Sequence, residues 1–232
     1  MVSAGEIKES LLHVLFPEIC AGCGNELFGQ RSSLCIRCID LMPSTNFESY
    51  AGNPVEKKFY GRLPLVGAAA SFYFGSHSMM QQLMHGFKYR GNRELGLQLG
   101  TLMGLALAAS KRFQVDALVP LPLHKSRERR RGFNQSAILA EGIAENLEVP
   151  VLGEVITRSS ATDTQTRRGR IDRWLNMEGR FRVVEPGAVR GKHLLLVDDV
   201  VTTGATLEAC GAELLQVEGV RLSIATLCYA NR

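Results

Sequence analysis

Residues 193–211, HLLLVDDVVTTGATLEACG, decide the fold and pose a chemical problem. Four apolar residues lead into two adjacent carboxylates, Asp198 and Asp199, although aspartate is a poor strand residue and is costly to bury without a partner. The loop that follows consists of small and hydroxyl residues: Thr202, Thr203, Gly204, Ala205 and Thr206. Such a loop at the start of a helix binds anions. One ligand satisfies both parts if it offers hydroxyl groups to the acids and a phosphate to the loop. The alternative is a capped helix after a buried strand with two surface aspartates.

The chain after residue 65 alternates apolar runs with amphipathic segments. Strands are expected at 65–74, 115–123, 153–158, 192–201 and 221–230. Helices are expected at 78–89, 93–109, 133–147 and 206–219. This alternation predicts an α/β fold, with a mostly parallel sheet and helices on both faces. Ligands of such sheets bind beyond the carboxyl ends of the strands.

Positive charge is concentrated in two segments. Residues 124–131 carry five cations against one acid, and residues 167–173 carry four arginines against one aspartate. The rest of the chain is slightly acidic, so the pattern favours focused anion binding over general coating of nucleic acid. The first segment follows the apolar run 115–123. Lys88 and Arg90, at the end of the helix expected at 78–89, provide further cations. The candidate anion-binding residues of the first basic segment and the glycine that follows it are Arg129, Arg130, Arg131 and Gly132. A solvated basic turn is the alternative.

The complete order of the deciding stretch, with two acids, two apolar residues and T-T-G-x-T, resembles the 5-phosphoribosyl-1-diphosphate (PRPP) signature of type I phosphoribosyltransferases. Further motifs narrow the resemblance: FKYRG (87–91), VPLPLHKSRERRRGFNQS (119–136), TDTQTRRGR (162–170) and a double CxxC near the N-terminus. Together they resemble the ComF family, which includes competence-associated proteins and amidophosphoribosyltransferase-like proteins. Asn92 departs from the pattern, because the family usually has an acid after KYRG.

The resemblance implies a role for each part of the site. Asp198 and Asp199 would bind the ribose hydroxyls with Mg²⁺ nearby, and residues 202–206 would hold the 5′-phosphate. Lys88, Arg131 and neighbouring cations would face the diphosphate. A flap would close over the site and exclude water; it would contain Thr164, Gln165, Thr166 and Arg167. The implied activity is transfer of ribose 5-phosphate from PRPP to an unidentified acceptor, in DNA uptake during competence or in nucleotide metabolism.

Four cysteines have the spacing of a metal site. Cys20 and Cys23 form one CxxC, and Cys35 and Cys38 form a second after an eleven-residue gap. This spacing is typical of tetrahedral Zn²⁺ with four protein ligands, which indicates a structural site. A redox disulfide and four unrelated cysteines are the alternatives. Cys210 and Cys228 are isolated in apolar surroundings, so we expect them to be small core residues.

Length and composition allow one ordinary domain plus a small module. The 232 residues are 45% hydrophobic and 22% charged, which is near the average of globular proteins. We expect a helix and four-cysteine zinc module at 1–45, a linker or extended arm at 46–64, and a phosphoribosyltransferase-like domain at 65–232. No apolar run approaches the roughly 18 residues of a membrane span, and no secretory signal is visible. The expected location is therefore the cytoplasm.

Two other functions remain open at this point. One is binding of single-stranded DNA, with DNA-uptake proteins as partners. Such binding would use the four-cysteine module, the basic segments and four aromatics: Phe87, Tyr89, Phe133 and Trp174. The other open function is that of a regulator, which would bind PRPP without catalysing a reaction. The five histidines form no acid–base constellation and are expected at the surface or in caps, so the sequence identifies neither a general base nor an acceptor pocket.

Overall fold

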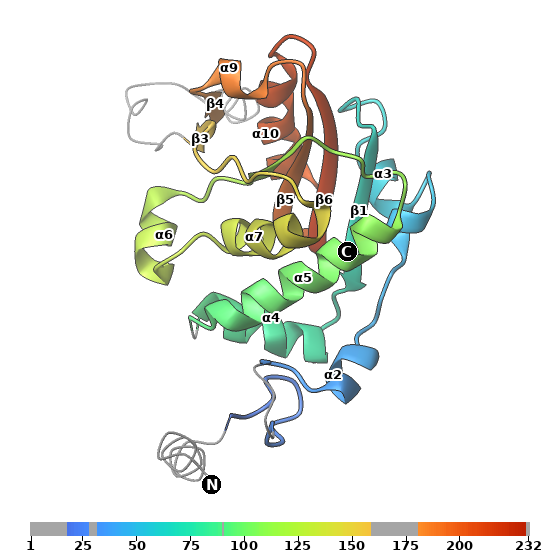
Figure 1. The fold of residues 1–232 in the computed structure, drawn as a ribbon, viewed down its shortest axis with the longest axis vertical. Helices are drawn as coiled ribbons and strands as arrows, with labels where there is room; N and C mark the ends of the chain where they lie inside the picture. The colour runs from blue at the N-terminus through green and yellow to red at the C-terminus, as the bar shows by residue number, and fades with distance from the viewer. Residues whose placement is uncertain (1–17, 28–31, 90, 159–180, 231–232) are drawn as a thin grey trace, which may run out of the picture.

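The computed structural model describes residues 18–27, 32–89, 91–158 and 181–230, and its centre is a four-stranded parallel sheet (Figure 1). In spatial order, the strands are β1 (Gly67–Tyr73), β6 (Arg221–Tyr229), β5 (His193–Val201) and β2 (Ala117–Pro120). The expectation of a parallel sheet is confirmed. Because every neighbouring pair is parallel, the carboxyl ends of all four strands meet at one edge of the sheet.

The strand expected at 153–158 lies outside this sheet. Its ordered part, β3 (Ile156–Arg158), pairs antiparallel with β4 (Phe181–Val183) to form a separate two-stranded sheet. An isolated bridge from Val151 to Leu118 touches the β2 edge of the main sheet. The short apolar run therefore joins a local hairpin instead of extending the parallel sheet.

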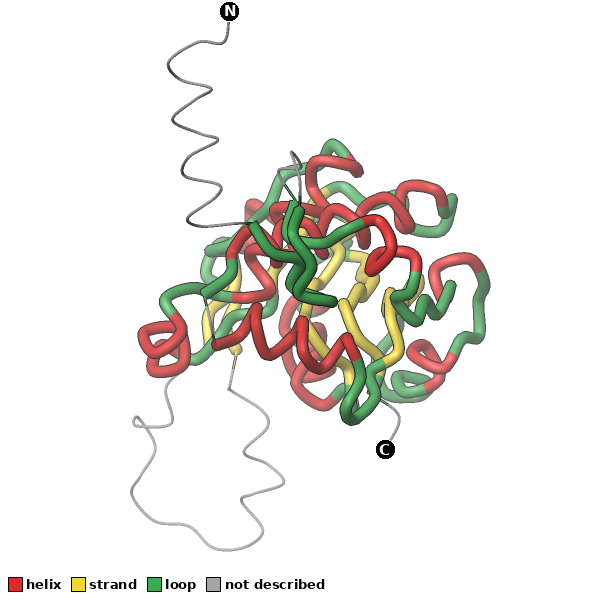
Figure 2. The backbone as a smooth tube through the Cα atoms, turned by 90° about the horizontal axis from the view of Figure 1, so that it is seen from below, coloured by secondary structure: helices red, strands yellow, loops and turns green. Residues whose placement is uncertain are grey.

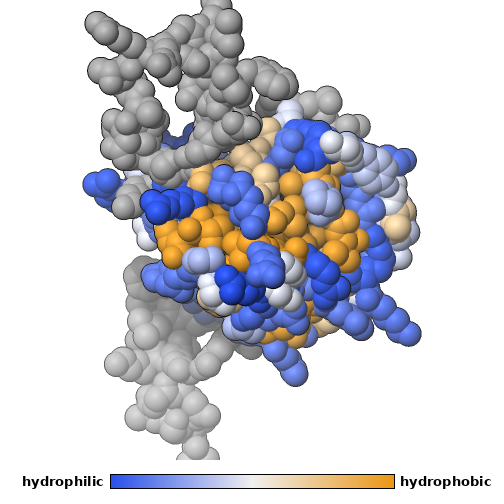
Figure 3. Space-filling view, turned by 90° about the horizontal axis from the view of Figure 1, so that it is seen from above, coloured by the Kyte–Doolittle hydropathy of each residue, from blue (hydrophilic) through white to orange (hydrophobic). Residues whose placement is uncertain are grey.

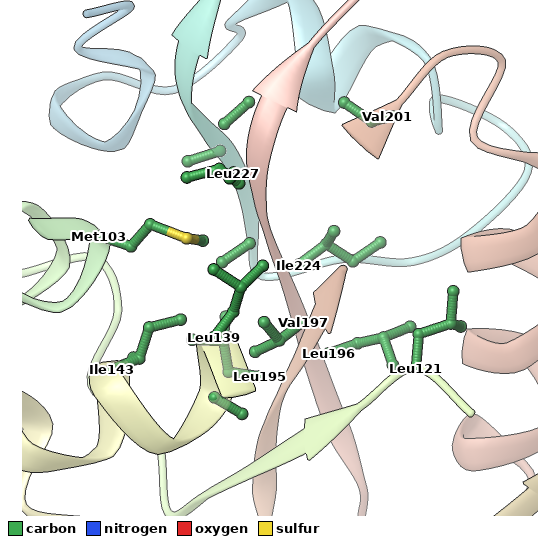
Figure 4. Packing of buried hydrophobic residues seen from close by; sticks show 14 of the residues in the cluster. Met103, Leu121, Leu139, Ile143, Leu195, Leu196, Val197, Val201, Ile224 and Leu227 are labelled. Carbon is green, nitrogen blue, oxygen red and sulfur yellow. The ribbon is translucent and has the colours of Figure 1, made fainter. Parts of the chain in front are cut away.

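Helices cover both faces of the main sheet, as the tube view shows (Figure 2). The longer helices are α4 (Met79–Tyr89), α5 (Arg93–Ala109), α7 (Gln135–Leu147) and α10 (Ala205–Leu215). Met103 of α5 and Leu139 of α7 point toward Leu195 and Leu227 on one face, whereas Leu196 lies on the other (Figure 4). All five side chains are buried, so the sheet is the middle layer of one continuous core.

Two glycines allow α5 and α7 to approach closely. A Cβ atom at Gly100 would lie 2.5 Å from the carbonyl oxygen of Leu139, and one at Gly142 would lie 2.4 Å from that of Leu97. Any larger residue at either position would push the helices apart. This contact fixes α7, whose first turn reaches the carboxyl edge of the sheet.

Residues 46–64 do not form the extended arm expected from their Pro, Gly and Asn punctuation. They contain η1 (Phe47–Ser49) and α3 (Pro54–Lys57), and the side chains of Phe47 and Phe59 are 1% exposed. The amide of Asn53 joins this segment to β1 by donating to the carbonyl oxygens of Phe47 and Ala68. The segment is thus part of the core, and the proposed domain boundaries on either side of it stay predictions.

The remaining short helices are α2 (Ile36–Asp40), α6 (Lys125–Arg131) and α9 (Pro186–Val189). Within the described ranges, every helix is too short or too polar to cross a bilayer. Apolar side chains reach the surface in the view from above, where polar side chains border them (Figure 3). The helix expected at 1–16 lies outside the described residues. Cys210 and Cys228 are fully buried, which confirms that they are core residues.

Candidate functional site

The two adjacent acids lie near the carboxyl end of β5 and contact two different helices. The hydroxyl of Ser136, in the first turn of α7, donates to Asp198 Oδ1 at 3.0 Å. Lys88 Nζ, in the last turn of α4, lies 2.7 Å from Asp199 Oδ2. The side chains of Lys88 and Asp199 are 21% and 15% exposed, so this ion pair is largely shielded from water. Segments that are far apart in the sequence thus meet at the acids.

The environment of Asp198 favours its neutral form. Burial, followed by the negative charge of Asp199, raises the pKa of Asp198 to about 7. The hydrogen bond from Ser136 and the charge of Lys88 act in the opposite direction but are outweighed. The site therefore holds a carboxyl group that changes charge near neutral pH, and such groups are common where ligands bind or react.

The loop at 202–206 leads directly into the N-terminus of α10. Gly204 has a φ of 80°, which a residue with a side chain rarely adopts, and it caps the 11-residue helix α10 without any side-chain cap. Thr203 and Thr206 are exposed, and Thr203 Oγ1 accepts weakly from the N–H of Ala205 at 3.4 Å. The positive end of α10 therefore faces the loop, as the sequence predicted.

Residues of the segment 46–64 support this loop, and sequence reasoning missed them. The ring of Phe59 packs on Gly204, where a Cβ atom would lie only 2.8 Å from it. Arg62 donates to the carbonyl oxygen of Thr203 at 3.3 Å and pairs with Glu208 of α10. The only sequence signal was an apolar residue, Phe59, inside a stretch punctuated like a linker.

The basic segment after β2 forms the short helix α6, which was not predicted. The helix is followed by Gly132, its C-terminal cap, whose φ of 84° lies in the left-handed region. Arg129 and Arg130 are exposed, whereas Arg131 is half-buried and donates to Gln135 Oε1 at 2.6 Å. Lys88 joins α4 to the acids through its ion pair with Asp199. Arg90 and the expected flap residues 164–167 lie outside the described residues.

Of the four aromatics considered for DNA stacking, Phe87 and Phe133 have described side chains, and these two do not form an exposed platform. Phe87 is fully buried and stacks on the half-buried Phe133 with ring centroids 5.8 Å apart. Trp174 lies outside the described residues. A different aromatic cluster, which we call the tyrosine cluster, consists of Phe47, Tyr73 and Tyr229 with centroid separations of 5.6–6.3 Å.

The four cysteines of the double CxxC come together. The sulfur atoms of Cys20, Cys23, Cys35 and Cys38 all lie within 4.8 Å of one another, close enough to share one metal ion. Burial raises the pKa of Cys20, but backbone N–H groups, first that of Cys35, lower it more and bring it to about 6. A thiolate held by backbone donors next to three further thiols fits a structural metal site.

The four-cysteine cluster docks on the helices that precede the site. Gln82 of α4 donates to the carbonyl oxygen of Ala21 at 3.2 Å. Gln98 of α5 accepts from the N–H of Ser33 at 2.9 Å and donates to Ser32 Oγ at 2.8 Å. One end of α4 therefore touches the cluster, while its other end carries Lys88.

One histidine departs from its expected place. His193 is 3% exposed, and its ring nitrogens contact the carbonyl oxygen of Gln114 at 2.8 Å and Ser223 Oγ at 2.9 Å. The expectation of a surface or capping residue is wrong there, because His193 begins β5 between two neighbouring segments; burial lowers its pKa. His124 does cap α6, by accepting from the N–H of Ser126.

Comparisons with known proteins agree with the fold. The phosphoribosyl transferase domain family matches residues 134–232. The DNA utilization protein YhgH of Salmonella typhimurium is 32% identical over 215 residues, or 90% of this chain and 89% of the relative. Its Escherichia coli K12 counterpart is 33% identical over 153 residues, or 64% of this chain and 66% of the relative, slightly under two thirds.

The chain is also similar to a competence protein and to a solved amidotransferase structure. Competence protein F of Haemophilus influenzae is 27% identical over 222 residues, or 90% of this chain and 92% of the relative. Among solved structures, glutamine PRPP amidotransferase from B. subtilis aligns with 18% identity and a TM-score of 0.42, over 60% of this chain and 30% of that one.

The parallel sheet and the matched domain define a protein with a type I phosphoribosyltransferase fold, carrying a four-cysteine cluster at its N-terminal side. The relatives narrow this class. The chain belongs to the ComF family.

Proposed function

We propose that this protein binds PRPP with Mg²⁺ and transfers its ribose 5-phosphate to a nitrogen acceptor, releasing diphosphate. The observation that carries the proposal is the meeting of Asp198, Asp199 and Lys88 beside the uncapped start of α10. Carboxylates accept hydrogen bonds from sugar hydroxyls, a helix start binds a phosphate, and cations stabilise a departing diphosphate.

Each substituent of PRPP then has a partner in the chain. Asp198 and Asp199 hold the ribose hydroxyls, residues 202–206 hold the 5′-phosphate, and Lys88, Arg90 and the arginines 129–131 with Gly132 face the diphosphate. Mg²⁺ prefers oxygen ligands, which the two carboxylates supply, and when bound it would neutralise charge on the diphosphate. Zn²⁺ would fill the four-cysteine cluster and stabilise its fold. The flap expected at 159–175, which contains residues 164–167, would shield the reacting carbon from water.

The transfer is a displacement at the anomeric carbon. The C1–O bond breaks with its electron pair leaving on the diphosphate, and a C1–N bond forms from the lone pair of the acceptor nitrogen. The proton of that nitrogen passes to water. The protein's contribution is electrostatic: cations near the leaving group and carboxylates near the hydroxyls lower the barrier as the ribose gains positive charge.

Calorimetric titration with PRPP and Mg²⁺ at physiological salt tests the proposal. Asp199→Asn is expected to weaken PRPP binding by about 10- to 100-fold, because a charge-assisted hydrogen bond is worth roughly 1.5–3 kcal/mol. Glu141→Gln, which removes a carboxylate paired with Arg93 far along α7, is the matched control and should bind normally. Unchanged affinity in Asp199→Asn would remove the assignment of this site.

A second candidate function is single-stranded DNA binding. The observation that favours it is the row of exposed arginines 127, 129 and 130 on α6, together with relatives named for DNA utilization and competence. Affinity for single-stranded DNA that falls steeply with salt, in a folded protein that does not bind PRPP, would favour this function and DNA-uptake proteins as partners. PRPP binding without diphosphate release in the presence of any acceptor would indicate a regulator.

A further inference from the structure

The segment that follows α3 supports both the loop at 202–206 and the helix behind it. The ring of Phe59 packs on Gly204, and a Cβ atom at Gly211 would lie 2.8 Å from Cδ2 of Leu63. The side chains of Phe59 and Leu63 are both buried. The segment therefore runs along α10, from the cap at Gly204 to the middle of the helix.

The guanidinium of Arg62, in this segment, joins three parts of the region. Its Nη1 donates to the carbonyl oxygen of Lys58 at 3.0 Å and to that of Thr203 at 3.3 Å. Its Nη2 pairs with the carboxylate of Glu208, which lies in the first turn of α10. A guanidinium presents its N–H donors in a rigid planar fork, so it restrains the relative positions of the groups that accept from it. Arg62 thus ties the end of α3, the loop and α10 together.

The contact between Arg62 and Thr203 sets the direction of one N–H group in the loop. In a trans peptide the C=O and the N–H point in opposite directions. Because the carbonyl of Thr203 points at Arg62, the N–H of Gly204 points away from it. Among the described residues, no acceptor is bonded to that N–H, which lies at the positive end of α10. The N–H of Gly204 is therefore available to an anion on the side of the loop that faces away from Arg62.

Glu208 acts against an anion in the loop. Its carboxylate lies in the first turn of α10, and its side chain is 29% exposed. Without a partner, this negative charge would cancel part of the positive potential at the start of the helix. The ion pair with Arg62 neutralises it. Because the side chain of Arg62 is 40% exposed, water screens this pair and its electrostatic effect is modest.

We propose that Arg62 is a positioning residue of the 5′-phosphate subsite, which directs the N–H of Gly204 toward the phosphate and neutralises Glu208. Arg62 does not itself touch the phosphate, because it lies behind the peptide whose N–H binds the anion. The inference rests on the proposed function in one respect, which is that the anion is the 5′-phosphate of PRPP. Two probes follow from it: ribose 5-phosphate uses the loop, whereas inorganic diphosphate uses the cations near the acids.

Titration of the full chain with ribose 5-phosphate, followed by ¹H–¹⁵N NMR, tests the positioning role without requiring turnover. The amide signal of Gly204 is expected to move in the wild type. Arg62→Gln should weaken binding by about 3- to 10-fold, the equivalent of one hydrogen bond, and should reduce the movement of that signal. Affinity for inorganic diphosphate with Mg²⁺ should stay within about twofold, because its proposed contacts lie at Lys88 and α6. Unchanged signals away from α10 would show that the variant is folded.

A second substitution isolates the electrostatic part of the role. Glu208→Gln, added to Arg62→Gln, removes the acid that has lost its partner and should recover about 2- to 5-fold in affinity for ribose 5-phosphate. In the wild-type background, Glu208→Gln should not weaken binding. Arg190→Gln is the matched control, because it removes an exposed arginine that pairs with Glu218 beside the start of β5, at the opposite edge of the sheet. Its affinity for ribose 5-phosphate should equal that of the wild type.

Equal affinity for ribose 5-phosphate in the wild type and Arg62→Gln overturns the inference, and so do equal losses for ribose 5-phosphate and diphosphate. Titration of the same variants with PRPP separates this inference from the proposed function. PRPP binding that is the same in both proteins would remove the positioning role alone. Binding of ribose 5-phosphate that depends on Arg62, in a protein that does not bind PRPP, would support the subsite and remove the transfer reaction. A wild type that binds neither ligand would remove both.

Discussion

Replacing Asp198 by asparagine is expected to stabilise the protein while impairing the site. The carboxyl of Asp198 has a pKa of about 7 in the folded chain, against an ordinary value of 3.8. Between these values the folded state holds a proton that the unfolded state has lost. The contribution of this group to stability therefore falls as the pH rises from about 4 to about 7, and it stays low above that range. Asparagine has no charge to bury and can still accept from Ser136.

The size of the effect follows from the two pKa values. Each unit corresponds to about 1.4 kcal/mol, so the penalty removed by Asp198→Asn reaches at most about 4 kcal/mol above pH 7. At about pH 5.5 the penalty that Asp198 imposes on the folded state is roughly 2 kcal/mol. The gain in free energy of unfolding from Asp198→Asn should therefore be about 2 kcal/mol larger above pH 7 than at about pH 5.5. For a chain of this size, that difference corresponds to about 4–8 °C in Tm.

Thermal unfolding followed by circular dichroism at about pH 5.5 and pH 8 measures this difference. Glu145→Gln is the control, because Glu145 is an exposed acid on α7 and its loss should shift Tm little at either pH. The same Asp198→Asn protein should bind PRPP more weakly than wild type. A Tm gain that is equal at both pH values, or a loss of stability at pH 8, would refute the reasoning about the buried carboxyl.

Two further outcomes concern the metal and the loop. We expect the purified protein to retain roughly one equivalent of Zn²⁺ by atomic emission, because four thiolates close one tetrahedral site. Cys38→Ser should abolish this zinc and lower Tm, whereas Cys210→Ser should keep it. A full equivalent in the Cys38 variant would contradict a four-cysteine site. Gly204→Ala is expected to cost about 1–3 kcal/mol in denaturant unfolding and to weaken PRPP binding, because φ is positive and the added Cβ meets Phe59. Gly153→Ala, with no atom within 4 Å of the new Cβ, should be near neutral, and equal effects would show that the loop geometry does not matter.

Local patterns were enough to predict the strand β5 and the acids near its end. The run 193–201 is apolar until the two aspartates, and the structure contains that strand as β5. The CxxC spacing likewise predicted a cluster whose four sulfur atoms do converge. In both cases the deciding residues are close together in sequence, so their spacing carries the geometry directly.

The missed parts depend on residues that are distant in sequence. Phe47, Tyr73 and Tyr229 meet only because β1 and β6 are neighbours in the sheet, a pairing that periodicity does not determine. The segment 46–64 looked like a linker because Pro, Gly and Asn punctuate it, yet the side chains of Phe47, Val55 and Phe59 are almost completely buried. Asn53 satisfies several backbone groups there, which lets a segment rich in turn residues pack as core.

The ion pair between Lys88 and Asp199 joins the proposed diphosphate contact to the proposed ribose contact. Lys88 and Asp199 belong to two motifs far apart in the chain, and we propose that they bind the diphosphate and a ribose hydroxyl, respectively. In PRPP the diphosphate and the nearest hydroxyl are on adjacent carbons, so the groups that bind them must lie close to each other. Lys88 Nζ and Asp199 Oδ2 meet this requirement, because they form an ion pair at 2.7 Å. Ligand binding would then replace one ion pair by two contacts, one with the diphosphate and one with the hydroxyl. The cost of bringing two like-charged groups, the acids and the diphosphate, into one site is thereby reduced, because Lys88 lies between them.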